Sequence, residues 1–175
     1  MDISNTLKNL SQNRLYWLSY IVLGLGLLAI ALFYQYVLEE LPCVVCIQVR
    51  LWFSLLILVA LVGLILRKNT LLNLLAQSGL IVSAIGLVER SYLLLGTERG
   101  FIFADCGFNA GLPEWFAIEQ WIPWLYQVET SCGYTPEILF GITMAEALML
   151  LSVCLLIVSV TVIVVTLYGQ FKNKF

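Results

Sequence analysis

The sequence predicts an all-α integral membrane protein: a four-helix transmembrane bundle with one long loop that contains a short membrane-surface helix. Hydrophobic residues make up 61% of the 175 residues, charged residues only 11%, and the mean hydropathy is +0.96. This composition provides too little polar surface to cover a soluble globule of this size. Long uncharged runs alternate with short polar segments, and basic residues gather at the ends of the runs.

Charge and residue usage exclude several functional classes. The net charge of −2 and the absence of a glycine-rich phosphate loop argue against a nucleic-acid or nucleotide partner. The chain contains no histidine, so the commonest general base and the commonest metal ligand are both missing. Catalysis must therefore rest on cysteine, carboxylate or lysine side chains.

Each of the four apolar runs is long enough, or nearly so, to cross a hydrocarbon layer of about 30 Å. A cleaved signal peptide is the alternative for the first run, but its apolar core would be shorter and would end in small residues, whereas this run ends in Phe33-Tyr34-Gln35-Tyr36. The predicted spans are residues 15–37, 43–66, 71–88 and 143–168.

Short polar segments separate the first three spans. Residues 38–43 form a connection so short that Cys43 and Cys46 must lie at the membrane face where the first span ends. Arg67-Lys68 ends the second span, and Glu89-Arg90 ends the third. Four spans place both termini on one side, so residues 1–175 form a single membrane domain.

The basic residues predict the orientation of the bundle. Most of them flank the spans on the side of the termini, and the opposite side holds Arg99 and most of the acidic residues. The positive-inside rule then places both termini in the cytoplasm. For a bacterial inner membrane, the cysteines at positions 43 and 46 and the loop of residues 91–140 face the periplasm, where disulfides persist. The flanking basic residues are Lys8, Arg14, Arg67, Lys68, Lys172 and Lys174.

The loop of residues 91–140 is far longer than a connector needs to be, which favours a functional loop. It contains Cys106 and Cys132, and tryptophan and tyrosine residues are frequent between positions 112 and 126. Such aromatic side chains prefer the headgroup region, so we expect this stretch to lie along the membrane surface. A small aromatic core within the loop is the alternative.

Pro42-Cys43-Val44-Val45-Cys46 is the strongest chemical motif. A thiol in the first turn of a helix faces unpaired backbone N–H groups that stabilise its thiolate. Two structural disulfides are the usual interpretation of four exported cysteines. However, a disulfide between Cys43 and Cys46 would close a very small loop and stabilise little, which favours redox exchange.

Arg50 follows Cys46 by one helical turn, on the same face. A basic residue in a span is costly and by default marks function. Arg50 can hold Cys46 as a thiolate or donate hydrogen bonds to a ligand inside the membrane. An arginine that snorkels to the headgroups is the alternative.

The remaining candidates carry weaker signals. A four-cysteine metal site fits poorly, because Cys106 and Cys132 stand far apart in the sequence. Cys154 lies within an apolar run and is most simply a packed small residue. Glu146 has two interpretations, an intramembrane functional carboxylate or a side chain that reaches the surface.

The combination of these features resembles the DsbB family of bacterial inner-membrane disulfide-generating proteins. The resemblance covers most of the chain: four spans, Pro42-Cys43-Val44-Val45-Cys46-Ile47 at the start of the second, Arg50 one turn later, and a cysteine pair in the long loop. Leu112-Pro113-Glu114-Trp115, Trp121-Ile122-Pro123 and Leu139-Phe140-Gly141 add to it.

The resemblance implies a quinone-dependent protein-disulfide oxidoreductase with redox disulfides Cys43–Cys46 and Cys106–Cys132. A reduced periplasmic DsbA-like protein of thioredoxin fold attacks the loop pair, and Cys106 forms the mixed disulfide. Cys132 then engages Cys43, which leaves Cys46 as a thiolate against a quinone, either ubiquinone or menaquinone. Arg50 matches the family arginine that contacts the quinone.

Two departures from well-known members concern the quinone site. Val49 stands where an acidic residue often precedes the arginine, and the chain has no histidine. Two other functions stay open on the residues alone. One is a reductive thiol carrier that works in the direction of vitamin K epoxide reductase-like proteins, and the other is a structural membrane protein with stabilising disulfides.

Overall fold

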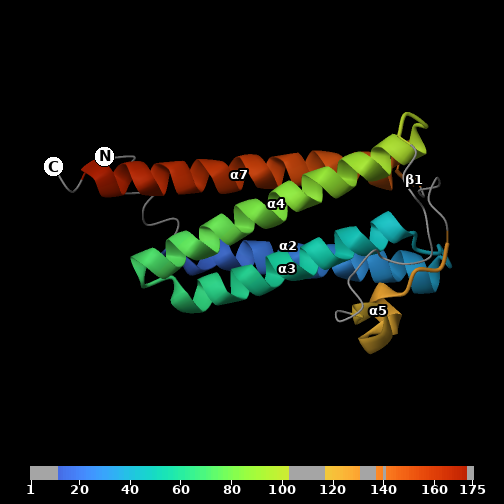
Figure 1. Ribbon diagram of the computed structural model, residues 1–175, viewed down its shortest axis with the longest axis horizontal. Coiled ribbons are helices and arrows are strands. Elements are labelled where there is room, and N and C mark those ends of the chain that lie inside the picture. Colours follow the sequence, from blue (N-terminus) through green and yellow to red (C-terminus); the bar gives the residue numbers. More distant parts are fainter. Residues whose placement is uncertain (1–11, 103–116, 131–136, 140, 173–175) are drawn as a thin grey trace.

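A computed structural model describes residues 12–102, 117–130, 137–139 and 141–172. Within these ranges, four helices are long and apolar enough to cross a membrane. They pack side by side in an antiparallel bundle, in which α3 lies against α2 and α4, and α7 lies against α4 (Figure 1). The all-α bundle predicted from the hydropathy pattern is therefore confirmed.

The first two long helices have local start signals in the sequence. Helix α2, Arg14–Val37, begins after Asn13, whose side chain accepts a hydrogen bond from the Leu15 amide at 3.1 Å. Helix α3, Val44–Leu66, begins after Cys43, which occupies the N-cap position in an extended conformation. Asparagine is a favoured N-cap, because its side-chain oxygen satisfies an amide that the first turn leaves open.

Helix α4, Thr70–Glu98, continues ten residues past Val88, where the sequence predicted that the span would end. The loop predicted to begin at residue 91 is thus helical for its first eight residues. The charged Glu89-Arg90 pair limits the apolar stretch but does not interrupt the backbone. The helix ends at Glu98, two residues before Gly100, whose φ of +74° permits a Schellman motif in which the Phe101 amide donates to the Gly96 carbonyl at 3.1 Å.

Helix α7, Met144–Lys172, follows a short antiparallel pair of strands, β1 (Glu137–Leu139) and β2 (Ile142–Thr143). A capping box starts the helix. The Glu146 amide donates to the Thr143 hydroxyl at 3.3 Å, and the Glu146 carboxylate accepts from the Thr143 amide at 3.3 Å. This reciprocal pair satisfies two open amides of the first turn.

Two helical turns, α5 (Ile118–Trp121) and α6 (Pro123–Tyr126), lie beside the bundle at the end where α3 begins, which we name the cysteine end (Figure 1). They fall within the aromatic stretch for which a short helix was predicted. Trp121 and Trp124 are 63% and 58% exposed, as suits side chains that meet a headgroup region. That these turns lie on a membrane surface stays a prediction.

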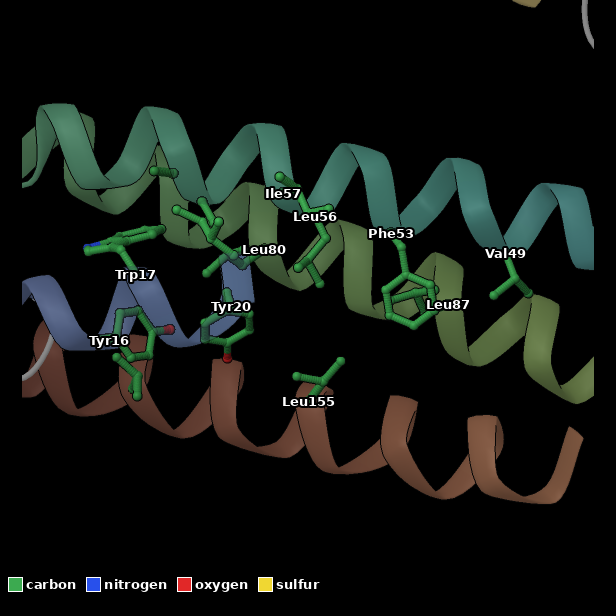
Figure 2. Packing of buried hydrophobic residues seen from close by; sticks show 14 residues of the cluster. Tyr16, Trp17, Tyr20, Val49, Phe53, Leu56, Ile57, Leu80, Leu87 and Leu155 are labelled. Carbon is green, nitrogen blue, oxygen red and sulfur yellow. The ribbon is translucent and has the colours of Figure 1, made fainter. Parts of the chain in front are cut away.

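The main core fills the space between the four long helices (Figure 2). Trp17 and Tyr20 of α2 point into this space, and the Tyr20 hydroxyl reaches the Ser159 hydroxyl of α7 at 2.9 Å. A second hydroxyl pair, Ser91 and Ser152, joins α4 to α7 at 3.1 Å. These pairs satisfy polar groups between helices, where no water competes for them.

Gly63 of α3 provides a test of this packing. A Cβ atom at Gly63 would overlap the ring of Trp17, which is fully buried, whereas a Cβ at Gly26 would have nothing within 4 Å. We therefore expect Gly63→Ala to destabilise the bundle by about 1–3 kcal/mol through overpacking. Gly26→Ala is the matched control and should be neutral or slightly stabilising.

Thermal unfolding of the purified variants in detergent, followed by far-UV circular dichroism, measures the difference. Equal melting temperatures for the two variants would contradict the packing of Trp17 against α3.

Candidate functional site

Cys43 and Cys46 lie together at the start of α3. Their sulfur atoms are 2.7 Å apart, and the Cys43 Sγ accepts a hydrogen bond from the Cys46 amide at 3.4 Å. Cys43 is only 1% exposed, and Cys46 is partly buried. A disulfide has a sulfur–sulfur distance of about 2.05 Å, so the two thiols are close enough to form one on oxidation with only a small movement. The open amides of the first turn favour a thiolate at this position.

Arg50 is buried one turn deeper in α3, with 6% of its surface exposed. Its guanidinium donates to three acceptors from two other parts of the chain. Nη1 donates to the Gln35 side-chain oxygen at 2.6 Å and to the Leu125 carbonyl at 3.0 Å. Nη2 donates to the Ala31 carbonyl at 3.2 Å. The guanidinium is therefore held inside the protein, not extended to the surface as a snorkelling arginine would be.

A cavity of about 220 Å³ opens beside these residues. It lies between α2, α3, α4 and α7, and its lining is almost entirely apolar. Cys46 and Arg50 contribute to the wall, together with Tyr34. The cavity thus combines an apolar interior, a thiol and a cation. The apolar lining includes Leu27, Leu28, Phe53, Leu94, Leu148 and Leu151.

Helix α6 is docked onto α3 beside Arg50. Tyr126 is buried, and its hydroxyl lies 2.6 Å from the Ser54 hydroxyl. Because Ser54 donates its own proton to the Arg50 carbonyl at 2.9 Å, Tyr126 is the donor in this pair. The Tyr36 hydroxyl donates to the Trp124 carbonyl at 2.7 Å, which fixes α6 to α2 as well. Ile47, Leu51 and Leu125 form the apolar part of this contact.

The chain that follows α6 reaches the first cysteine of the motif. The amides of Glu129 and Thr130 both donate to the Pro42 carbonyl, at 3.1 and 3.3 Å, and Thr130 forms a bridge with Cys43. Cys132 comes two residues later in the sequence, but both Cys132 and Cys106 lie outside the described residues. The predicted pairing of these two cysteines therefore stays a prediction.

Glu146 and Cys154, the weaker candidates, are not among the residues that line the cavity. Glu146 belongs to the capping box of α7, and its carboxylate also pairs with Arg99 at the end of α4. This role is structural: the carboxylate joins the ends of two helices at the cysteine end. Cys154 is exposed on the surface of α7, so it is not the buried small residue that the sequence suggested.

Comparison with known proteins identifies the kind of protein that carries this site. The family model for disulfide bond formation protein DsbB matches residues 13–162. The chain belongs to the DsbB family.

Relatives in this family share about a third of their residues with the chain. Disulfide bond formation protein B 2 of Pseudomonas aeruginosa is 31% identical over 150 residues, which cover 84% of this chain and 89% of that protein. Disulfide bond formation protein B of Shewanella frigidimarina is 31% identical over 145 residues, which cover 82% and 86%. The chain is thus a multi-pass membrane protein of a disulfide-forming family, as its sequence motifs indicated.

The sequence did not reveal the residues that hold Arg50 in this DsbB-family protein. Gln35 appeared only as an uncharged residue of the first span, and Tyr126 only as one of several loop aromatics. The acceptor at Leu125 is a backbone carbonyl, which no side-chain pattern can show. A polar amide near the end of an apolar span was the one available signal, because a buried amide needs a partner.

Tyr126→Phe tests how α6 is anchored. The change removes one hydrogen bond and leaves the Ser54 proton on the Arg50 carbonyl, so we expect α6 to undock more readily by about 1 kcal/mol. Amide hydrogen exchange of residues 118–128 should then be faster by about fivefold. Tyr168→Phe, on the exposed surface of α7, should leave it unchanged. Unchanged exchange in Tyr126→Phe would show that the hydroxyl does not anchor α6.

Proposed function

We propose that this protein reoxidises a periplasmic DsbA-like protein and passes the electrons to a membrane quinone, so that disulfides are generated de novo. The cavity between the helices carries the proposal, since it combines an apolar interior with Cys46 and Arg50 in its wall. An apolar site of this kind suits a lipid-soluble molecule. The thiol and the cation in its wall are the groups that electron transfer from cysteine to such a molecule would need.

The residues around the cavity suit a quinone ring. A cavity of about 150 Å³ lined by apolar side chains admits benzene, and this cavity is larger, at about 220 Å³. Quinone oxygens accept hydrogen bonds, and the guanidinium of Arg50 retains donors on Nη2 and Nε beyond the bonds that the described residues accept. A bound quinone supplies an acceptor for two electrons and two protons. Arg50 and Cys46 are the residues that we expect to hold it.

The proposed exchange conserves thiols and electrons at each step. A thiolate of the reduced partner attacks Cys106 of a Cys106–Cys132 disulfide and releases Cys132. Cys132 then attacks Cys43 of the Cys43–Cys46 disulfide and releases Cys46 as a thiolate. The partner's second thiol resolves its mixed disulfide with Cys106, and the partner leaves oxidised.

The freed Cys106 then attacks Cys132, which restores the loop disulfide and releases Cys43. Oxidation of the Cys43 and Cys46 thiols passes two electrons and two protons to the quinone. The net reaction converts a partner dithiol and a quinone to a partner disulfide and a quinol. Each transfer needs a good thiolate and access to the sulfur that it attacks.

The backbone contacts of the loop support the step between Cys132 and Cys43. Thr130 is bridged to Cys43, and two residues of extended chain span at most about 7 Å. Chain connectivity alone therefore limits how far a thiol at position 132 can move from Cys43. We also propose, from the positive-inside rule, that the cysteine end faces the periplasm and that both termini are cytoplasmic.

Cys46→Ser is the decisive variant. Without the Cys46 thiol no electron pair can leave for the quinone, so quinone reduction by the purified protein and a reduced thioredoxin-fold partner should fall to background. The absorbance change of the quinone measures this. Cys154→Ser, which removes a thiol on the outer surface of α7, should retain the wild-type rate. Activity of Cys46→Ser near that of the wild type, or turnover without quinone, would overturn the proposal.

Arg50→Lys tests whether Arg50 contributes to quinone binding and not to binding of the protein partner. A lysine keeps the charge but not the planar set of donors, so the KM for quinone should rise by about tenfold while the affinity for the partner changes little. Steady-state kinetics with each substrate varied in turn give both quantities. Arg90→Lys is the matched control, because Arg90 donates to Gln48 and does not line the cavity. An equal loss for both substrates would indicate a folding defect in place of a quinone contact.

A further inference from the structure

Gln35 makes the shortest of the hydrogen bonds that hold Arg50. Its side-chain oxygen accepts from Nη1 at 2.6 Å, and the Gln35 side chain is only 6% exposed. The residue lies near the end of α2, between the aromatic residues Tyr34 and Tyr36. A buried amide in an apolar helix is costly unless it is hydrogen-bonded, so this pair is a specific arrangement of two polar side chains from two helices.

Gln35 acts on the cavity only through Arg50. The α2 residues that line the cavity include Ala31 and Tyr34, but not Gln35. Gln35 and the Leu125 carbonyl together use both protons of Nη1. With Nη1 fixed in this way, the planar guanidinium has a defined orientation, and Nη2 and Nε carry the donors that remain for a ligand.

We infer that Gln35 is the positioning residue of the quinone site: its amide oxygen fixes the Arg50 guanidinium so that the remaining donors meet a quinone oxygen in the cavity. The inference rests on the proposed function, because it assigns a role within the same site. Binding to a donor that is already held in place loses less conformational entropy than binding to a mobile one. The fixed orientation of Arg50 should therefore increase the affinity for quinone.

The choice of an amide has a second consequence. A carboxylate at position 35 would accept the same hydrogen bond but would also neutralise the guanidinium. The neutral oxygen of Gln35 orients Arg50 and leaves its positive charge available to a thiolate at Cys46, which lies one helical turn away in α3. Two substitutions of Gln35 can therefore distinguish the effect of the orientation of Arg50 from the effect of its positive charge.

Gln35→Met and Gln35→Glu make this separation. Methionine has a similar length but no amide acceptor, so the KM for quinone should rise by about tenfold, with less than about a threefold change in kcat. Glutamate restores the acceptor, and its quinone KM should return to within about threefold of the wild type. Its negative charge should slow alkylation of Cys46 by iodoacetamide in the reduced protein at neutral pH, as measured by mass spectrometry of the Cys46 peptide.

Gln77→Met is the matched control. Gln77 is a buried glutamine of α4 whose amide donates to Asn73 at 3.2 Å, and it does not line the cavity. This variant reports the effect of losing a buried amide elsewhere in the bundle, and its quinone KM should equal that of the wild type.

A wild-type quinone KM in Gln35→Met would overturn the inference, as would an equal rise in Gln35→Met and Gln35→Glu, which would indicate packing. Failure of the proposed function has a different signature, because the wild-type protein would then either not reduce quinone when a reduced thioredoxin-fold partner is supplied or oxidise that partner without quinone. Alkylation of Cys46 gives a further separation, since it requires neither quinone nor partner. If Cys46 in Gln35→Glu were alkylated at the wild-type rate, the inference that the neutral amide of Gln35 leaves the charge of Arg50 available to Cys46 would be wrong.

Discussion

The burial of one guanidinium determines the arrangement at the cysteine end of the bundle. A charged group inside a membrane span is tolerated only when the surrounding protein satisfies it. Arg50 obtains acceptors from two turns of α2 and from the loop helix α6, so three segments must meet at one place. The same requirement brings α6 against α3 and leaves the cavity bordered by a cation. Loss of this contact would affect the loop and the cavity together.

The two thiols of the motif have different surroundings as a result. Cys43 is bridged to the loop segment that leads toward Cys132, whereas Cys46 lies in the wall of the cavity with Arg50. One face of the first turn of α3 therefore contacts the loop, and the other face lines an apolar cavity. This division is the one that the proposed exchange between a protein partner and a quinone requires.

The cysteine end is also strengthened by contacts that have no part in the chemistry. The Schellman motif at Gly100 ends α4, and the capping box of Thr143 and Glu146 starts α7. The ion pair between Arg99 and Glu146 then joins these two helix ends. These local motifs fix where α4 ends and where α7 begins.

The sequence by itself determined the four membrane helices, the position of Cys43 and Cys46 at a helix start, and the proximity of Arg50 to Cys46. Each of these follows from hydropathy, capping or helical spacing, which act over neighbouring residues. The roles of Gln35 and Tyr126, and the ion pair of Glu146 with Arg99, were decided only by the tertiary structure. Their partners are distant in the chain. A buried polar group forms its hydrogen bond with a group that the packing of the helices places beside it, and no local sequence pattern specifies that group.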